Sequence, residues 1–192
     1  MRLEPLSTGH DDGLWEASRP PEVWTWVTEQ PATRESFGRY LDAARGATAA
    51  GTEFAFATVS VARGRPIGMT RYMVLRPDDR GLEIGSTWLA PTMWRTGANV
   101  EAKLLQLQYA FETLGCLRVE LKTHAANARS RGAMERLGAT FEGVHRKHRI
   151  LPGLGVRDTA WYSVIDDEWP QVRAGLHARL ARLGSDAVGS AT

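Results

Sequence analysis

Residues 81–100 read GLEIGSTWLAPTMWRTGANV, a pattern typical of a strand that passes through a short loop into a helix. Side chains alternate along a strand, so the segment predicts one apolar face and one mixed face. The apolar face is expected to hold Leu82, Ile84 and Trp88, and the mixed face Glu83, Thr87 and Leu89. Gly85 in the middle of the strand predicts a bulge or a close approach of another backbone.

The loop that opens the helix has the features of an anion site. Free backbone N–H groups at a helix N-terminus, together with the helix dipole, attract negative charge. Gly97 lets a phosphate approach the backbone closely, and Arg95 offers a charged donor beside it. On these residues alone, the alternative of an ordinary strand–loop–helix turn with one glycine stays open.

The rest of the chain alternates between strand patterns and helix patterns. Upstream they predict a strand at 2–6, helices at 11–18 and from Thr33, and a hairpin of strands at 54–62 and 67–75. Downstream they predict a helix ending at Gly115, a strand at 117–124, a helix between Asn127 and Gly138, strands at 140–149 and 158–164, and a final helix. This order predicts an α/β domain with a mixed sheet.

Composition limits the class of protein. The chain has 192 residues, of which 43% are hydrophobic and 24% charged, and its net charge is +2, as in folded globular domains. Such a small net charge does not by itself indicate a nucleic-acid-binding protein. No apolar run is long enough to span a membrane, and residues 1–5 lack the apolar core of a signal peptide, so a cytoplasmic protein is expected. We expect one domain over residues 1–184 and a flexible tail over 185–192.

Several kinds of site are not expected. Cys116 is the only cysteine, which excludes an internal disulfide and a cysteine-based zinc site. Phosphate-binding and dinucleotide-binding glycine motifs, the serine-hydrolase elbow and the His-Glu-x-x-His helix are absent from the sequence. His145 and His148 are three residues apart on an expected strand, where they would point to opposite faces, so no metal site is predicted.

Residues 94–99, WRTGAN, stand in a longer pattern that resembles the GCN5-related N-acetyltransferases, most of all their RimJ/RimL-type branch. In that family the pyrophosphate loop reads (Gln/Arg)-x-x-Gly-x-(Gly/Ala). Further similarity lies in Ala110–Gly115, in Arg118-Val119, in Asn127 with Ser130, and in residues 137–143 and 157–170. The resemblance implies a single α/β (α+β) domain whose mixed, mostly antiparallel sheet has helices on both faces and a splayed central strand pair.

The resemblance also implies a reaction. The family's chemistry would make this chain an acyl-CoA-dependent N-acyltransferase that moves an acetyl group from acetyl-CoA to a primary amine of a small molecule, without a metal. Backbone groups of the splayed strand would pair with the pantetheine arm and stabilise an oxyanion. The expected cofactor contacts are Trp88, Leu89, Trp94, Arg95, Thr96, Gly97, Ala98, Asn99, Asn127 and Ser130.

Three positions depart from the family pattern. Trp94 replaces the first Gln/Arg of the loop and Asn99 replaces its last Gly/Ala, but the central glycine remains. Met134 stands seven residues after Asn127, where many members carry a tyrosine that protonates the leaving thiolate. Ser130, a water molecule or the unassisted thiolate would then serve, so Ser130 is a candidate catalytic residue as well as a cofactor contact.

The resemblance assigns Glu83, fourteen residues before Gly97, the role of general base. An amine with a pKa of roughly 8–10 must lose a proton before it attacks a thioester. The alternative is a surface carboxylate paired with an arginine such as Arg71, itself a candidate substrate contact. Trp24 and Trp26 are candidates to line the amine site, or else they pack in the core.

Other functions remain open on the sequence. The acceptor could be the α-amine of a protein N-terminus, as in the RimJ/RimL-type branch, or the chain could be a non-catalytic acyl-CoA-binding module. The basic run at residues 145–149, HRKHR, is usually a solvated hairpin, but it would also attract an acidic substrate or, less favourably, nucleic acid. A small-molecule amine or a peptide N-terminus is the expected partner, with a homodimer also compatible and no membrane expected.

Overall fold

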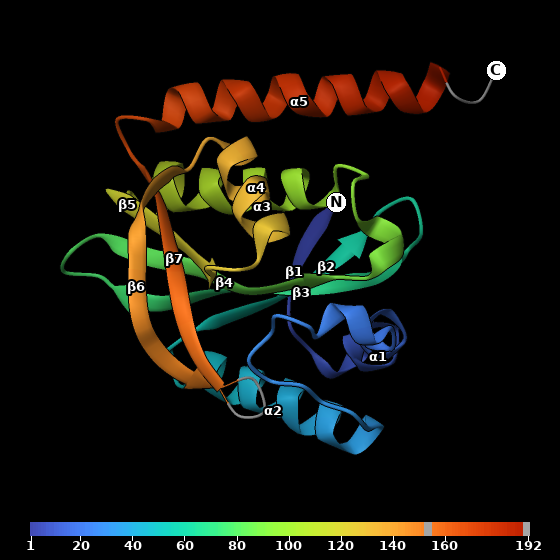
Figure 1. The fold of residues 1–192 in the computed structure, drawn as a ribbon. Helices are drawn as coiled ribbons and strands as arrows, with labels where there is room; N and C mark the ends of the chain where they lie inside the picture. The colour runs from blue at the N-terminus through green and yellow to red at the C-terminus, as the bar shows by residue number, and fades with distance from the viewer. Residues whose placement is uncertain (152–154, 190–192) are drawn as a thin grey trace.

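The computed structural model describes residues 1–151 and 155–189. Its main elements alternate in the predicted order (Figure 1). They are β1 (Arg2–Pro5), α1 (Asp11–Ser18), α2 (Arg34–Ala49), β2 (Phe54–Ser60), β3 (Arg65–Arg76), β4 (Gly81–Leu89), α3 (Ala98–Gln108), β5 (Arg118–His124), α4 (Ala128–Leu137), β6 (Thr140–Leu151), β7 (Gly155–Ile165) and α5 (Trp169–Gly189). Short 3-10 turns precede α1, α2 and α3, and a π-helical turn at Tyr109–Thr113 follows α3.

The strands form one seven-stranded sheet in the order β1-β2-β3-β4-β5-β7-β6. Every neighbouring pair is antiparallel except β4 and β5, which run parallel. Helices α1 and α2 cover one face, and α3 and α4 cover the other, with α5 lying across them on the outside (Figure 1). The predicted α/β domain with a mixed, mostly antiparallel sheet is therefore confirmed.

Each face of the sheet has its own apolar core. The larger core lies under α3, α4 and α5 and includes Leu107, Val119 and Tyr162, all fully buried. The smaller one lies under α1 and α2 and is rich in aromatic rings. Helix α2 begins at Thr33, whose hydroxyl accepts the amide of Ser36, and it buries the predicted stripe of Phe37, Tyr40, Leu41 and Ala44.

A bulge in β4 changes which face its side chains occupy. Met69 of β3 pairs with Trp88, but Arg71 pairs with Gly85, so β4 has one more residue than β3 in this interval. Ser86 takes up the extra residue with a φ of 45°. Leu82 and Ile84 therefore pack under α3, whereas Trp88 packs under α2. The bulge predicted at Gly85 is confirmed, and the shared face predicted for Leu82, Ile84 and Trp88 is wrong because the extra residue inverts the alternation.

Strands β4 and β5 pair for only three residues and then separate. Their ladder runs from Gly81 opposite Arg118 to Glu83 opposite Glu120. Beyond it, β4 stays paired with β3 as far as Leu89, and β5 stays paired with β7 as far as His124. The predicted splayed strand pair is therefore present, and its two inner edges have backbone groups that no neighbouring strand satisfies.

The last helix extends into the segment expected to be a tail. Helix α5 continues through Gly189, so residues 185–189 of the expected tail are helical, while residues 190–192 lie outside the described part. The turn expected around Pro152 also lies outside it. Within residues 1–151 and 155–189, no helix is both long enough and apolar enough to cross a membrane.

Candidate active site

One short segment reaches both splayed strands from the α1–α2 side of the sheet. The ring of Trp24 lies 5.5 Å from that of Trp88, near the end of β4. The ring of Trp26, two residues later, lies 5.1 Å from that of His124 at the end of β5. Trp24 is buried in the core and donates its indole N–H to the carbonyl of Ser18 at 2.9 Å, while Trp26 is only half-buried. Trp26 is thus the better placed of the two to meet a ligand at the strand ends.

On the opposite side, α3 starts next to the end of β4. Gly97 is the N-cap residue with a φ of 87°, and no side chain caps the helix. In the first turn the amide of Ala98 makes only a long hydrogen bond, 3.5 Å, to the Thr96 hydroxyl, and the amides of Asn99 and Val100 have no acceptor within the helix. Arg95 also has a positive φ, 65°, and Thr96 anchors the loop by donating its hydroxyl to the Met93 carbonyl at 2.8 Å. The geometry is that of an anion-binding helix N-terminus.

Trp94 links this loop to helix α4. Its indole N–H donates to the carbonyl of Leu89 at 2.9 Å, and the guanidinium of Arg129 lies 3.7 Å above its ring. Arg129 comes from the first turn of α4, on the other side of the separated strands. A cation thus stands near the loop although the family's Gln/Arg is replaced by tryptophan. Sequence reasoning missed Arg129 because nothing local ties residue 129 to residue 94.

Helix α4 begins as predicted. The Asn127 side chain accepts the amide of Ser130 at 3.1 Å and donates to the Thr123 hydroxyl at 3.2 Å, so it caps the helix and ties it to β5. The hydroxyl of Ser130 is half-buried and makes no hydrogen bond within the described residues. Met134 packs one turn further on in the larger core.

We expect Met134→Leu to leave turnover intact and to cost less than about 1.5 kcal/mol of unfolding free energy, because the side chain only fills the core and the two residues have similar volume. Steady-state assays and chemical denaturation on the same preparations would check this. A collapse of kcat with unchanged stability would instead show that the thioether has a part in the reaction.

The carboxylate of Glu83 lies on the α1–α2 side of the sheet, at the point where β4 and β5 separate. One oxygen is 2.8 Å from Nζ of Lys122, whose ammonium also stands 3.6 Å over the ring of Trp161. Glu83 and Lys122 side chains are 12% and 13% exposed. The pairing with Arg71 that we considered is wrong, because the guanidinium of Arg71 lies 3.1 Å from a Glu53 oxygen and 5.0 Å from the ring of Tyr40.

Strand β7 adds cations to this face. Its outward residues alternate with the core residues, and Arg157 donates from Nε to the Thr159 hydroxyl at 3.0 Å. Burial and the neighbouring Arg149 lower the pKa of Arg157, whereas the charge of Glu83 raises it. The hairpin histidines also differ from the expectation. The rings of His145 and His148 lie 4.5 and 5.8 Å from Trp161, on one side rather than two, because extra residues between His145 and Arg149 form a second bulge.

A buried amine lies under β4 on the α3 side. Nζ of Lys103 is 2.8 Å from the Thr87 hydroxyl, 3.1 Å from that of Thr70 and 2.8 Å from Oε1 of Gln106. The residue is only 4% exposed, and burial lowers the pKa of its ammonium to about 7. Since Thr87 follows the bulge directly, this network holds the part of β4 that borders the separation from β5.

We expect Lys103→Met to weaken the pH dependence of stability. Between the folded pKa near 7 and the ordinary value of 10.5, the unfolded chain binds more protons, so the unfolding free energy rises with pH. The destabilising effect of Lys103 is complete below pH 7 and disappears as pH rises through that window. The gain in unfolding free energy from pH 7 to pH 9 should be about 2 kcal/mol smaller in the variant. Denaturant titrations at both pH values test this, and identical gains would refute it.

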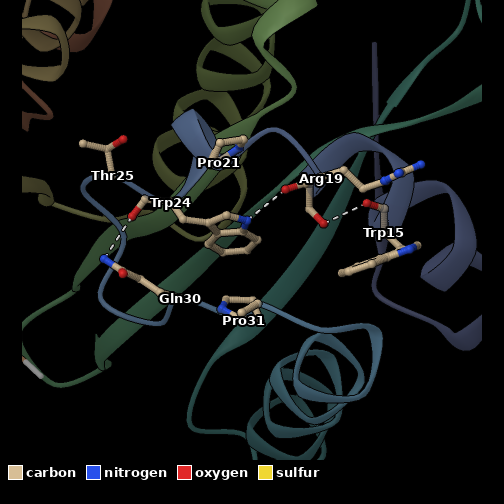
Figure 2. A pocket seen from close by; sticks show the side chains of 9 residues that line it. Trp15, Arg19, Pro21, Trp24, Thr25, Gln30 and Pro31 are labelled. Carbon is tan, nitrogen blue, oxygen red and sulfur yellow. Dashed lines mark hydrogen bonds between the residues drawn. The ribbon is translucent and has the colours of Figure 1, made fainter. Parts of the chain in front are cut away.

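A separate cleft lies elsewhere, between α1 and the segment that leads from it to α2. Its volume is about 650 Å³. Figure 2 shows Trp24 in the middle of this cleft, with Pro31, Gln30 and Trp15 around it. Glu83, Lys122 and Ser130 do not line it. The cleft therefore reaches the separated strands only through Trp24, the residue that it shares with the core around Trp88.

The predicted site residues fall on two sides of the separated strands. The 95–99 loop lies on the α3–α4 side together with Asn127 and Ser130, and Glu83 and Trp26 lie on the opposite side. Trp88 and Arg71 are occupied in the α2 core. Sequence reasoning missed Lys122, although a signal for it existed. Alternation along β5 places Lys122 on the same face as Glu120, and Glu120 is the ladder partner of Glu83. In residues 1–151 and 155–189, no group of His, Cys, Asp and Glu could hold a metal ion.

Known proteins agree with this geometry. A family model described as "Acetyltransferase (GNAT) domain" matches residues 1–140. A GCN5-related N-acetyltransferase from Brucella melitensis is 39% identical, with a TM-score of 0.87 over 93% of this chain and 81% of that chain. A protein from T. thermophilus described as a "putative acetyltransferase" is 37% identical, with a TM-score of 0.84 over 93% of each chain.

More distant likeness extends to RimJ from Mycobacterium smegmatis, at 19% identity and a TM-score of 0.79 over 92% of this chain and 88% of that chain, which shows a common fold. No curated protein matches the chain. The family model spans well over half of the sequence, and the Brucella melitensis structure shares more than a third of its residues. Together with the separated strands and the uncapped helix at their end, these matches show that the chain belongs to the GNAT family of acetyltransferases.

Proposed function

We propose that this GNAT acetyltransferase transfers the acetyl group of acetyl-CoA to the primary amine of a small molecule. The observation that supports it best is the separation of β4 and β5 after Glu83 and Glu120, with an anion-binding helix N-terminus on one side and a carboxylate on the other. A cofactor entering from the α3–α4 side would meet an amine arriving from the α1–α2 side.

The residues on the α3–α4 side fit a CoA group. The amides of residues 95–99 would hold the pyrophosphate, with Arg129 as a nearby cation. The unpaired edge of β4 would bond the pantetheine arm as an added strand would. When bound, acetyl-CoA supplies an activated thioester carbon. The Ser130 hydroxyl, which has no partner of its own in the described chain, would protonate the departing sulfur.

On the other side, Glu83 would take the proton that the amine must lose. Its oxygen Oε2 is bound to Lys122, which holds the carboxylate in place and leaves Oε1 for the amine or for one intervening water. The new bond joins the amine nitrogen to the acetyl carbon as the carbon–sulfur bond breaks. The amine proton goes to Glu83, and the thiolate takes a proton from water, or from Ser130, whose oxygen then regains a proton from water.

The second candidate acceptor is a protein or peptide N-terminus. The cleft between α1 and the segment that leads to α2 is lined by Pro21, Pro31 and two tryptophans, a surface that suits an extended peptide. RimJ from Mycobacterium smegmatis and a Vibrio cholerae protein described as a "putative ribosomal-protein-serine acetyltransferase", 18% identical with a TM-score of 0.72, have the same fold as this chain. A protein N-terminus as acceptor, and membership of the RimJ/RimL-type branch, would follow if peptides were the better substrates.

The experiment is an acceptor screen with acetyl-CoA that measures thiol release and confirms each product by mass. We expect acetylation of small primary amines with higher kcat/KM than of peptides that have free N-termini. Higher kcat/KM for peptides would favour the second class. If CoA binds in calorimetry but neither class is acetylated, the chain is a non-catalytic acyl-CoA-binding module.

A further inference from the structure

Arg157 is a buried cation without a carboxylate partner in the described chain. The residue is 9% exposed, and the only hydrogen bond that its side chain makes within the described chain is from Nε to the Thr159 hydroxyl. No ion pair of the described chain includes it, in contrast to Arg71, which is 7% exposed and pairs with Glu53. A guanidinium that is largely, though not fully, withdrawn from water is costly unless an anion compensates for it.

The terminal nitrogens of Arg157 remain open to a ligand. Three side-chain nitrogens of the described residues are fully buried and lack a hydrogen-bond partner, and they belong to Arg71, Gln106 and Trp161. The two terminal nitrogens of Arg157 also lack a partner there, but they are not fully buried. They therefore touch accessible space while having no protein acceptor among those residues. A planar pair of donors in this condition suits a carboxylate or a phosphate.

The position of Arg157 relates it to the acceptor side. Arg157, Thr159 and Trp161 alternate with Ala160 and Tyr162 of the core, so they lie on the face that also has Lys122, the ladder partner of Trp161. Thr159 pairs with His124, whose ring contacts Trp26. Arg157 is also close enough to Glu83 for the carboxylate to raise its pKa.

The surroundings of Arg157 are predominantly positive. Arg149 is its ladder partner, His148 bonds the same Thr159 hydroxyl, and His145 lies against Trp161. Asp158, the nearest acid on the hairpin, accepts the backbone amide of Lys147 at 2.6 Å. Glu83 is itself matched by Lys122. A negative group bound here would therefore offset an excess of positive charge.

We propose that the acceptor is an amine that also has an anionic group, a carboxylate or a phosphate, which Arg157 binds while the amine faces Glu83. This inference rests on the proposed acetyl transfer and narrows its substrate class. In this arrangement one small molecule would contact both side chains from the same face of the sheet, with its amine toward the Glu83 carboxylate and its anionic end toward the Arg157 guanidinium.

The first arm of the test compares matched acceptors that differ in one charge: phenylalanine with phenylalaninamide, and O-phosphoethanolamine with ethanolamine. We expect kcat/KM to be at least about tenfold higher for the anionic member of the preferred pair. Arg157→Gln should raise KM for that acceptor about tenfold or more and leave its kcat within about threefold. The same substitution should leave the KM of the member without the anionic group unchanged. Arg157→Lys should recover part of the loss. Which pair responds distinguishes a carboxylate from a phosphate.

The matched control is Arg146→Gln, an exposed arginine of the same hairpin, which should change KM less than about twofold at 0.15 M salt. Equal preference for neutral and anionic amines, or equal effects of the two variants, would overturn the inference while acetyl transfer stands.

A second arm measures binding without turnover. Calorimetry with saturating CoA, which fills the cofactor's own phosphate site, would titrate phenylalanine against phenylalaninamide and O-phosphoethanolamine against ethanolamine. We expect the member with the anionic group to bind more tightly in at least one pair and Arg157→Gln to remove the difference, in a variant whose melting temperature confirms folding. If no amine is acetylated, this arm still decides, since equal binding within both pairs contradicts the anion site and a difference that depends on Arg157 supports it.

Discussion

Glu83→Gln is expected to lower kcat by about 10²–10⁴-fold with little change in CoA affinity, which is the usual contribution of a positioned general base. Glutamine keeps the size of the side chain and a hydrogen-bonding oxygen near Lys122 but cannot accept the amine proton. Activity should return in part at high pH, where free amine is abundant, and the acidic limb of the pH–rate profile should move. Steady-state kinetics across pH, with calorimetry for CoA, would measure both effects.

Glu120→Gln is the matched control. Glu120 is the ladder partner of Glu83, lies 3.5 Å from the same Lys122 ammonium, and is also bound by Arg76 at 3.0 Å and Arg118 at 3.2 Å. Its loss should reduce stability, since three cations lose a partner, but kcat of the folded enzyme should stay within a few fold. If Glu83→Gln and Glu120→Gln have the same effect on kcat, Glu83 is a structural carboxylate and another group takes the proton.

Gly97→Val is expected to weaken CoA binding by about 100-fold or more. The N-cap φ of 87° is strained for any residue with a side chain, at a cost of about 1–3 kcal/mol, so the backbone should leave the conformation that presents the loop amides. A Cβ at this position would also lie 3.2 Å from the Leu183 side chain of α5, which would have to shift by a few tenths of an ångström. Calorimetry with CoA at several salt concentrations would measure the loss, and the salt dependence of binding should decrease with it.

Gly138→Val is the matched control, because it introduces the same backbone strain and the same side-chain crowding against α5 at a position outside the 95–99 loop. Gly138 caps α4 with a φ of 91°, and a Cβ there would lie 3.2 Å from Val172 of the same helix α5. Both variants should lose stability, but only Gly97→Val should lose CoA affinity in protein shown to be folded. Equal affinities in the two variants would remove the 95–99 loop from the cofactor site.

Much of the fold could be predicted from local patterns. The stripe of α2, the Asn127 cap of α4, the hairpin of β2 and β3 and the bulge at Gly85 all depend on residues that are near one another in the chain. The same is true of the loop at 95–99, since a helix N-terminus needs only a short segment. The splayed pair came from the family resemblance, because no local pattern states where two parallel strands stop pairing.

The ion pairs of the site could not be predicted in this way. Glu83 pairs with Lys122, thirty-nine residues away in the chain by their numbers, rather than with Arg71, because the parallel ladder brings β5 alongside β4 while Arg71 is bound to Glu53. Arg129 reaches Trp94 only because α4 starts across the separated strands. Each contact depends on where two distant elements meet, which residue types alone do not specify.

The sequence by itself determined the order of strands and helices, the caps and the glycine loop, since periodicity and capping act over a few residues. Only the tertiary structure decided which face of the sheet each site residue occupies. One extra residue in β4 moved Trp88 to the α2 core, and extra residues in β6 brought His145 and His148 together on Trp161. A bulge is counted against the partner strand, and its length therefore depends on how two strands pair, which alternation within one strand cannot reveal.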